Sequence, residues 1–443
     1  MKRVLKRNVL LSLLFLLFSV SLSAQYVNDS YPESYTVREK IIDTWFTEDI
    51  SVIRDKSSEI LQTNIGDYFL VRAEEHDGLM EIIVSPLVVQ TFNIVEYDVL
   101  LDGCENTDST KTVQIETWPK EALGSWILYR DVATGKPVKI RQYIMPDSEI
   151  FLEFFNTDLK TTASFSIFGG LVANQVSVVV PFDFFYTSSM KDIVGVTMRF
   201  PWEYIKTNNQ IYAETKYMIS VIHENLPALA DKTLLENDTD LGFLKWIIDG
   251  LVEPLVGGRV FDDALIASTV KAQATYSSPE DAYATYDYTR NLATASHSAD
   301  TGISYTANTS SVDVALEPFG FFVDDDGVKK RVEYIAKNGY NNEILKSILY
   351  ILTTTEPQLF YLGAIRNPAI SEANGKTIEY YSYNHAVAFF PWFDEDGYFH
   401  VKVFQDGKEF SFDKFLSIYP DSFTHLVRVK SSMNFFPLIT EKN

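Results

Sequence analysis

The stretch NHAVAFFPWFDEDGYFHVKVFQD, residues 384–406, decides the fold of the C-terminal half of this chain. His385 opens an apolar run that ends at Phe393, and residues 394–397 (DEDG) are typical of a tight turn. Residues 398–404 are again rich in aromatic and β-branched side chains, which favour strands. The stretch therefore predicts an antiparallel hairpin that begins with a histidine.

The register of this hairpin decides whether Asp406 meets His385. If Phe393 pairs with Tyr398, Asp406 lies directly opposite His385. If the loop is the two residues 396–397, Asp406 lies diagonally across, still on the same face, because strand side chains alternate with a period of two. A carboxylate beside an imidazole orients and charges a catalytic histidine. The alternative is that Asp406, which begins an Asp-Gly dipeptide, only shapes a turn.

Two segments upstream complete a pattern with the hairpin. Residues 278–292 read SPEDAYATYDYTRNL, and residues 338–352 read NGYNNEILKSILYIL. In the second segment, Asn341 or Asn342 can cap a helix over residues 344–352. In this order, the three segments resemble the core of the bacterial transglutaminase-like proteins, a branch of the papain-like cysteine enzymes. The resemblance extends over about residues 240–415.

The resemblance implies a lead-in helix, a helix that opens on a catalytic Cys, a strand that begins with His and a strand that ends in Asp. Tyr340 takes the Cys position, and His385 and Asp406 correspond to the remaining catalytic pair. A tyrosine hydroxyl titrates near about 10, against about 8.5 for a thiol, so it is a poor replacement. The chain's one cysteine, Cys104, lies far upstream in a turn-like segment. The resemblance therefore implies a fold, and the substitution argues against thiol chemistry.

The N-terminal half is rich in strands. From about Asp67, short runs of Val, Ile, Phe and Tyr are separated by turn signals such as DG, TGKP and MPDS. We expect an α+β protein, in which an antiparallel β-rich, sandwich-like domain precedes an α/β transglutaminase-like domain. The expected division is a signal peptide over residues 1–24, the β-rich domain over 25–230 and the second domain over 231–443.

The amino terminus has the pattern of a secretory signal peptide. Four basic residues precede an apolar run over residues 9–22, and Ser23, Ala24 and Gln25 form a small-residue cleavage zone. An uncleaved signal anchor is the alternative. We see no other apolar stretch long enough to cross a membrane. We therefore expect an exported protein in the periplasm, on the cell surface or secreted, with no stable membrane span after cleavage.

Charge and motifs exclude several classes of function. The formal net charge of −22 repels phosphate backbones, so we expect no nucleic-acid partner. Residues 324–327 and 394–397 are acidic turns, but they lack the spacing of a calcium loop. The histidines show no metal-ligand spacing. We expect neither a metal nor a cofactor.

Three functions are compatible with the sequence. The first is an exported, non-catalytic binding or scaffold protein, with a peptide or cell-envelope ligand. In it, a groove around Tyr340 and His385 binds without turnover, unless Tyr340 fills the cleft. The second is an active hydrolase or acyl transferase with a nucleophile other than Cys. The third is a purely structural envelope protein. The absence of a Cys at Tyr340 favours the first.

The signal peptide gives the first testable prediction. Amino-terminal sequencing of the protein from its native host should find a mature chain that begins near Gln25, because the small residues before it suit a signal peptidase. A soluble protein that still begins at Met1 would contradict the prediction.

Overall fold

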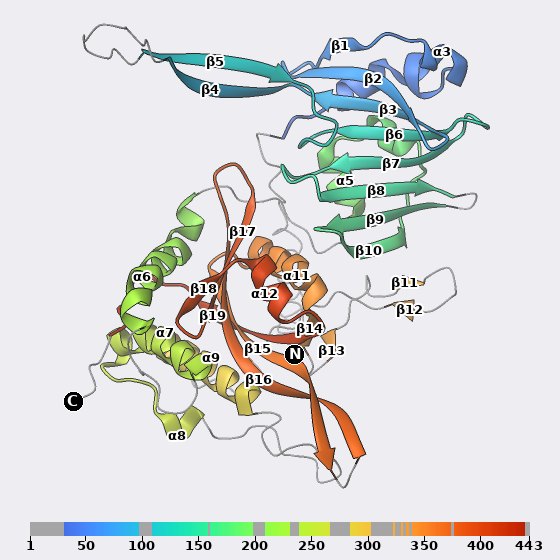
Figure 1. Cartoon of the computed structure of the whole chain (residues 1–443). Coiled ribbons are helices and arrows are strands. Elements are labelled where there is room, and N and C mark those ends of the chain that lie inside the picture. The colour runs from blue at the N-terminus through green and yellow to red at the C-terminus, as the bar shows by residue number, and fades with distance from the viewer. Residues whose placement is uncertain are drawn as a thin grey trace, which may run out of the picture.

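The structure is a computed structural model, and it places a mixed α+β chain with two large antiparallel sheets (Figure 1). This agrees with the α+β class that the sequence predicted. The structure describes residues 31–96, 109–157, 160–197, 209–230, 239–265, 284–302, 322–323, 329–330, 334–335, 339–373 and 376–438.

The first sheet holds eight antiparallel strands, each hydrogen-bonded to the next. A two-stranded ribbon of β4 (Val88–Glu96) and β5 (Ser109–Thr117) extends from it between β3 and β6 (Figure 1). The order of the eight strands is β1 (Glu59–Gln62), β2 (Tyr68–His76), β3 (Leu79–Pro86), β6 (Trp126–Asp131), β7 (Pro137–Tyr143), β8 (Ile150–Asn156), β9 (Thr161–Ile167) and β10 (Gly170–Ser177).

Short helices cover one face of this sheet, where the expected sandwich would have a second sheet. Trp45, Phe46 and Phe185 come from these helices and pack against strand residues such as Trp126 and Phe154. The expectation of a sandwich-like domain therefore gives way to one open sheet with a helical layer. The helices are α2 (Tyr35–Lys40), the π-helix η1 (Ile42–Phe46), α3 (Ile50–Arg54), α4 (Phe184–Thr187) and α5 (Met190–Thr197).

A buried arginine ties the two ends of the helical layer together. Arg38 of α2 is 0% exposed and donates to the carbonyl oxygens of Phe185, Tyr186 and Ser188, at 2.6–3.0 Å. Burial lowers the pKa of Arg38 to about 10, and the nearby carboxylate of Glu33 opposes that shift. A buried guanidinium keeps its charge only when its donors are satisfied, so these bonds fix the segment after β10 against the segment before β1.

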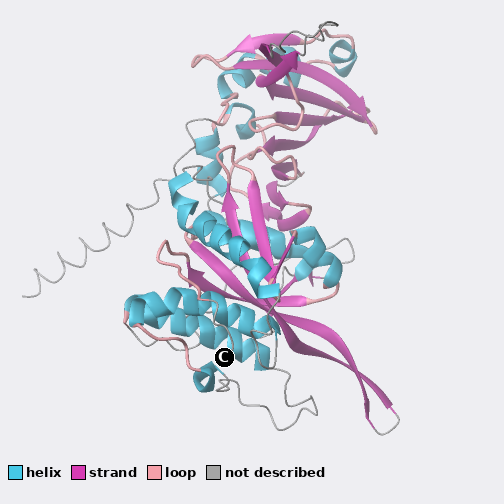
Figure 2. Cartoon of the chain, turned by 60° about the vertical axis from the view of Figure 1, so that its left-hand side comes forward, coloured by secondary structure: helices cyan, strands magenta, loops and turns pink. Residues whose placement is uncertain are grey.

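The second sheet has seven antiparallel strands and two helical layers. Helices α6, α7 and α9 cover one face, and α11 and α12 cover the other (Figures 1 and 2). The strand order is β13 (Tyr334–Ile335), β14 (Gly339–Asn341), β19 (Phe423–Lys430), β15 (Leu359–Ala373), β16 (Lys376–Phe393), β17 (Phe399–Gln405) and β18 (Lys408–Phe410).

The helices of this half differ in length and position. The long ones are α6 (Ala213–Ala230), α7 (Thr239–Val256), α9 (Ala284–Thr301) and α11 (Asn342–Thr355). The short elements are the 3₁₀-helix η2 (Asn209–Tyr212), α8 (Asp262–Leu265), α12 (Phe412–Ile418) and a small pair of strands, β11 (Phe322–Val323) and β12 (Lys329–Lys330).

Side chains of the central strands alternate between the two helical layers. Tyr361 and Phe389 join the cluster beneath α11 and α12, whereas Phe360 and Phe390 join the cluster beneath α6, α7 and α9. Both faces of β15 and β16 are therefore apolar, as in any sheet that is covered on both sides.

Helix α6 belongs with the second sheet. Its residues Met218, Ile222 and Leu229 lie in the same apolar cluster as Phe390 of β16. The change from one sheet to the other therefore occurs before α6, upstream of the boundary that we placed near residue 230.

Helix α11 joins the two sheets. The hydroxyl of Ser347 donates to the carbonyl oxygen of Ile167, at the end of β9 (2.7 Å). Phe168, in the β9–β10 turn with a φ of +50°, packs edge-on against Tyr350, with ring centroids 5.8 Å apart. The ammonium of Lys346 lies 3.9 Å from the centroid of the same phenylalanine ring. The tip of the first sheet thus rests on α11.

On the opposite face, helix α9 covers a buried histidine. His425 of β19 is 0% exposed, and its ring lies 4.3 Å from that of Tyr286. Burial, with a smaller contribution from the positive charge of Arg290, lowers the pKa of His425 to about 3. The imidazole is therefore neutral in the folded protein at neutral pH.

This histidine predicts how stability depends on pH. Below about pH 6.5, the unfolded chain binds a proton at His425 that the folded chain binds only near pH 3. The free energy of unfolding should therefore fall as the pH is lowered from 6.5 to 4.5, by up to about 1.4 kcal/mol per pH unit from this group. Urea unfolding of His425→Gln should show a shallower slope, and the exposed control His76→Gln should not. Parallel curves for His425→Gln and the unchanged protein would contradict the prediction.

Candidate functional site

Tyr340, at the predicted nucleophile position, lies in the core. It is the middle residue of β14, it is 0% exposed, and it belongs to the apolar cluster beneath α11. Gly339 before it has a φ of +80°, and a Cβ there would lie 2.3 Å from the backbone of Thr424. Because β14 presses this closely on β19, Tyr340 enters the core rather than an open cleft.

His385 lies in the same row of the sheet, but far from Tyr340. Tyr340 pairs with Thr424, Thr424 with Ile365, and Ile365 with His385. The row crosses four adjacent strands, and three strand spacings place the two residues about 14 Å apart. The structure therefore does not bring Tyr340 and His385 together at the floor of one groove.

Asp406 is not the carboxylate of His385. Phe393 pairs with Phe399, so the hairpin register differs by one residue from both registers that we predicted. Asp406 lies in the two-residue turn after β17, with a φ of +50°, and its carboxylate lies 3.3 Å from the ammonium of Lys408. The alternative of a turn-forming Asp406 describes its position.

A different carboxylate holds His385. Asp240 Oδ2, in the first turn of α7, lies 2.9 Å from His385 Nδ1 and is positioned to accept a hydrogen bond from it. The side chain of Asp240 is 9% exposed and that of His385 is 41% exposed. A buried acceptor on Nδ1 fixes the ring and leaves Nε2 to bind a ligand or a proton.

Two further side chains complete this group. The amide of Gln405 donates to Asp240 Oδ2 at 3.0 Å and contacts the hydroxyl of Tyr419 at 2.8 Å. Burial raises the pKa of Tyr419, as does the charge of Asp240 to a smaller extent, while its bond to Gln405 opposes the shift. The ring of Tyr419 lies 5.5 Å from that of His385. We call His385, Asp240, Gln405 and Tyr419 the His385 network.

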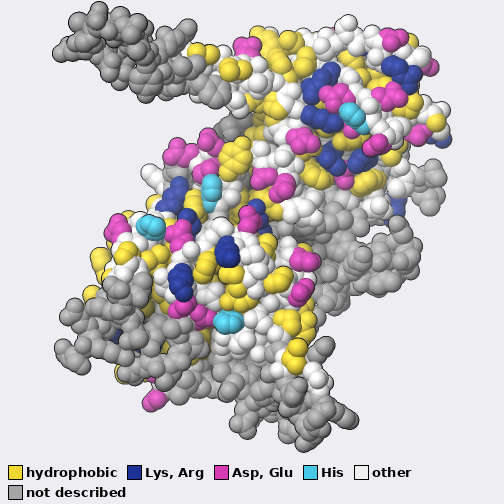
Figure 3. Space-filling model, in the orientation of Figure 1, with side chains coloured by type: hydrophobic (Ala, Val, Ile, Leu, Met, Phe, Trp, Pro, Cys, Tyr) yellow, Lys and Arg dark blue, Asp and Glu magenta, His cyan; other side chains and the backbone are white. Residues whose placement is uncertain are grey.

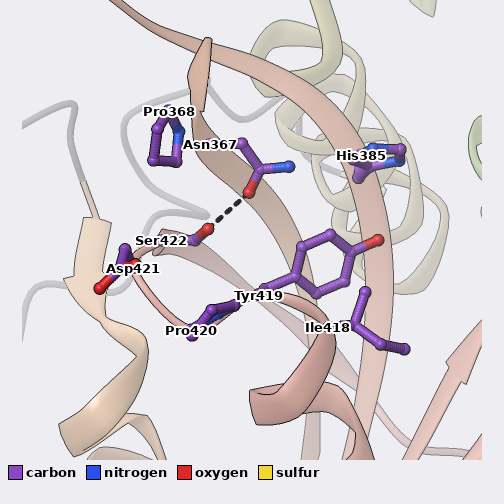
Figure 4. Close-up of a pocket in the computed structure, with 8 residues that line it drawn as sticks. All are labelled: Asn367, Pro368, His385, Ile418, Tyr419, Pro420, Asp421 and Ser422. Atoms are coloured by element: carbon purple, nitrogen blue, oxygen red, sulfur yellow. Dashed lines mark hydrogen bonds between the residues drawn. The ribbon is translucent and has the colours of Figure 1, made fainter.

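The His385 network borders an open hollow of about 500 Å³ (Figure 4). Residues of β15 and β16 form one side, and the segment between α12 and β19 forms the other. Figure 4 shows the ring of Tyr419 between His385 and the segment 420–422. The lining residues are Asn367, Pro368, His385, Ile418, Tyr419, Pro420, Asp421 and Ser422.

The start of α11 holds the second side of the hollow in place. Asn342, which is 0% exposed, donates from its backbone to the carbonyl of Ser422 and from its side chain to the carbonyl of Tyr419, both at 3.0 Å. Its side-chain oxygen accepts from the hydroxyl of Thr424 at 2.6 Å. The sequence indicated Asn341 or Asn342 as the cap of this helix, and the cap is Asn341.

The hollow holds a hydroxyl, but that hydroxyl is engaged elsewhere. Ser422 Oγ donates to Asn367 Oδ1 at 2.6 Å, as Figure 4 shows. Cys104 lies outside the described residues. Within the described part of the chain, His385 bonds to Asp240 and not to a hydroxyl, so the site is arranged as an oriented imidazole without an activated nucleophile.

Among the described residues, a possible metal-binding group lies elsewhere, on the first sheet. Side-chain ligand atoms of Glu74, His76 and Glu81 lie within 4.8 Å of one another. Lys120 contacts Glu81 and the guanidinium of Arg72 contacts Glu74, so cations already compensate these carboxylates. Figure 3 shows basic side chains gathered with acidic ones over this sheet. The group therefore gives no reason to assign a metal.

Sequence reasoning missed three of the four members of the His385 network. Asp240 stands 145 residues before His385, in the first turn of α7, where an acidic residue is common without any function. Gln405 precedes the Asp406 that we chose, and a correct register would have identified it. Tyr419 follows a short helix and carries no motif.

Comparisons with known proteins cover the first sheet and not the hollow. A family model described as a domain of unknown function (DUF8515) matches residues 27–204, which include the first sheet and its helices. No curated protein and no solved structure matches the chain. In the described part of the chain, we find no helix with the length and apolarity that a membrane crossing requires.

The close approach of Gly339 to the backbone of β19 gives a prediction with a matched control. Gly339→Ala and Gly78→Ala both place a Cβ at a positive φ, which costs about 1–2 kcal/mol. Only at Gly339 would the Cβ also meet backbone atoms, whereas nothing lies within 4 Å at Gly78. Urea unfolding should show a loss of roughly 4 kcal/mol or more for Gly339→Ala and about 1 kcal/mol for Gly78→Ala. Equal losses would contradict the packing of β14 on β19.

Proposed function

We propose that this chain is an exported, non-catalytic binding protein that takes up a peptide-like ligand in the hollow beside His385. Its C-terminal half is then a degenerate relative of the transglutaminase-like proteins, with Tyr340 at the position of the lost Cys. The N-terminal sheet serves as a scaffold against which α11 is held.

One observation carries the proposal. The imidazole of His385 is fixed and borders an open hollow. Tyr340, at the nucleophile position, is fully buried and lies three strand spacings, about 14 Å, from His385 across the sheet. Binding sites are typically concave, with a few well-positioned polar groups among apolar side chains. Asn367, His385 and Asp421 supply such groups, and Pro368 and Ile418 supply apolar surface.

A hydrolase or acyl transferase is the second candidate, because Ser422 lines the same hollow as His385. Its hydroxyl would have to leave Asn367 and reach the imidazole before it could act as a nucleophile. The bond that it makes instead favours binding over catalysis. A purely structural envelope protein is the third candidate, and the open hollow argues against it.

Export suits this function. The amino-terminal pattern of a signal peptide and the use of a single cysteine fit a protein whose stability comes from its apolar cores rather than from disulfides. A periplasmic or surface location would expose the hollow to the peptides of the cell envelope.

Titration of the mature protein with cell-wall stem peptides tests the proposal. His385→Ala and Asp240→Asn should each weaken binding at least tenfold, since the first removes the imidazole and the second the acceptor that fixes it. His400→Ala is the matched control, because His400 is similarly exposed and also bonds to a carboxylate, that of Asp394, at the far end of the hairpin. Calorimetry should show no change for that variant.

Two results would count against the binding function. Equal affinities for His385→Ala and the unchanged protein would place the ligand elsewhere. Release of cleaved peptide, detected by mass spectrometry and abolished by Ser422→Ala, would establish the second candidate instead.

A further inference from the structure

The strands β15 and β16 extend beyond their neighbours as a projecting ribbon (Figures 1 and 2). Strand β19 pairs with β15 from Leu359 to Arg366 and then ends at Phe423. From Asn367 to Ala373, the described part of the chain pairs β15 with β16 on one side and with no strand on the other. This edge carries backbone groups that require water or another strand.

The open edge begins at the hollow. Asn367 and Pro368 are its first two residues, and both line the hollow together with Ser422, which immediately precedes β19. A strand added to this edge would continue the line of β19 and would pass directly through the hollow. On one face of that strand, side chains would point toward His385.

The other face of the same edge presents a cation. The guanidinium of Arg366 lies 4.5 Å from the ring centroid of Tyr381 and 6.0 Å from that of Phe423. The two rings meet edge to face at 6.0 Å. Among the described residues, Arg366 has no carboxylate partner, and its five donors remain available to an acidic group.

We infer that the ligand is an extended peptide that pairs by its main chain with residues Asn367–Ala373 of β15 and carries an acidic side chain to Arg366. This inference rests on the proposed function, because the peptide uses the same hollow. Added strands gain affinity from main-chain bonds and specificity from alternate side chains. Pro368 offers no N–H, so β15 can contribute only an accepting carbonyl at this position.

The charge of the chain sharpens the choice of ligand. The protein has a net charge of −22, and an acidic peptide would be repelled by most of its surface. The guanidinium of Arg366, which has no carboxylate partner among the described residues, therefore fixes where the acidic residue binds. The rings of Tyr381 and Phe423 hold the guanidinium of Arg366 in place. This limits the side-chain conformational entropy that Arg366 would lose on binding.

Selection from a phage-displayed library of random heptapeptides on the mature protein tests the inference. We expect extended sequences rich in Val, Ile and Thr with one Asp or Glu. Two synthetic copies of the strongest binder are then compared, one N-methylated at its odd-numbered residues and the other at its even-numbered residues. One of the two copies should lose at least tenfold in affinity. Arg366→Gln should weaken binding of the same peptide about tenfold. The control Arg54→Gln, which removes an exposed charge from helix α3, should not.

The outcomes that overturn the inference differ from those that overturn the proposed function. If both N-methylated copies bind as well as the unmodified peptide, but binding is lost in the His385→Ala variant, the hollow remains a binding site and pairing at the edge is excluded. A library that yields no binder would exclude the edge as a peptide site, while the stem-peptide titration still decides the hollow. A dimer in sedimentation velocity that Arg366→Gln dissociates would show that a second copy occupies the edge.

Discussion

The burial of helix α11 between two sheets is the constraint on which the C-terminal half depends. Leu345, Ile348 and Leu349 are buried in an apolar cluster that includes residues of both sheets, and Ser347 and Tyr350 meet the tip of the first sheet. α11 is buried on most of its surface, polar residues such as Asn342, Ser347 and Thr353 included, so its neighbours must cover it on more than one side. Each buried leucine or isoleucine contributes about 2 kcal/mol, so α11 stabilises both sheets and their arrangement.

The same helix determines where the hollow forms. Its first turn begins directly after β14, and the close approach of Gly339 to Thr424 holds β14 against β19. Asn342, in that first turn, then donates to the carbonyls of Tyr419 and Ser422. The wall opposite His385 is therefore fixed by a buried amide and not by packing alone. Because α11 also contacts the β9–β10 turn, the first sheet contributes to the position of this wall without lining the hollow.

The sequence predicted more of the fold than of the site. Local patterns identified the α11 helix and its asparagine cap, the β16–β17 hairpin and the strand-rich first half, because each depends on side chains a few residues apart. The sheet into which the first strands assemble, and the helices that cover it, depend on contacts across the chain. The hydrogen bond between Asp240 and His385 likewise joins two residues that are 145 positions apart in the sequence.

The register of the hairpin shows how a small local difference changes the site. We considered loops of four and two residues, and the loop has five, residues 394–398. Asp394 accepts from the backbone N–H groups of Asp396 and Tyr398, which holds the additional residue in the loop. A shift of one residue moves every side chain of the returning strand to the other face. Gln405 thus joins His385, and Asp406 moves into the next turn.

Unequal strand lengths explain why the hollow and the open edge occur together. β15 and β16 have 15 and 18 residues, whereas β17 and β19 have seven and eight. Where the short strands end, their chains turn away and uncover both a face and an edge of the long pair. The face forms the hollow at His385, and the edge begins one residue after Arg366. A ligand that fills the hollow therefore meets an unpaired backbone at once, which an extended peptide satisfies and a compact small molecule does not.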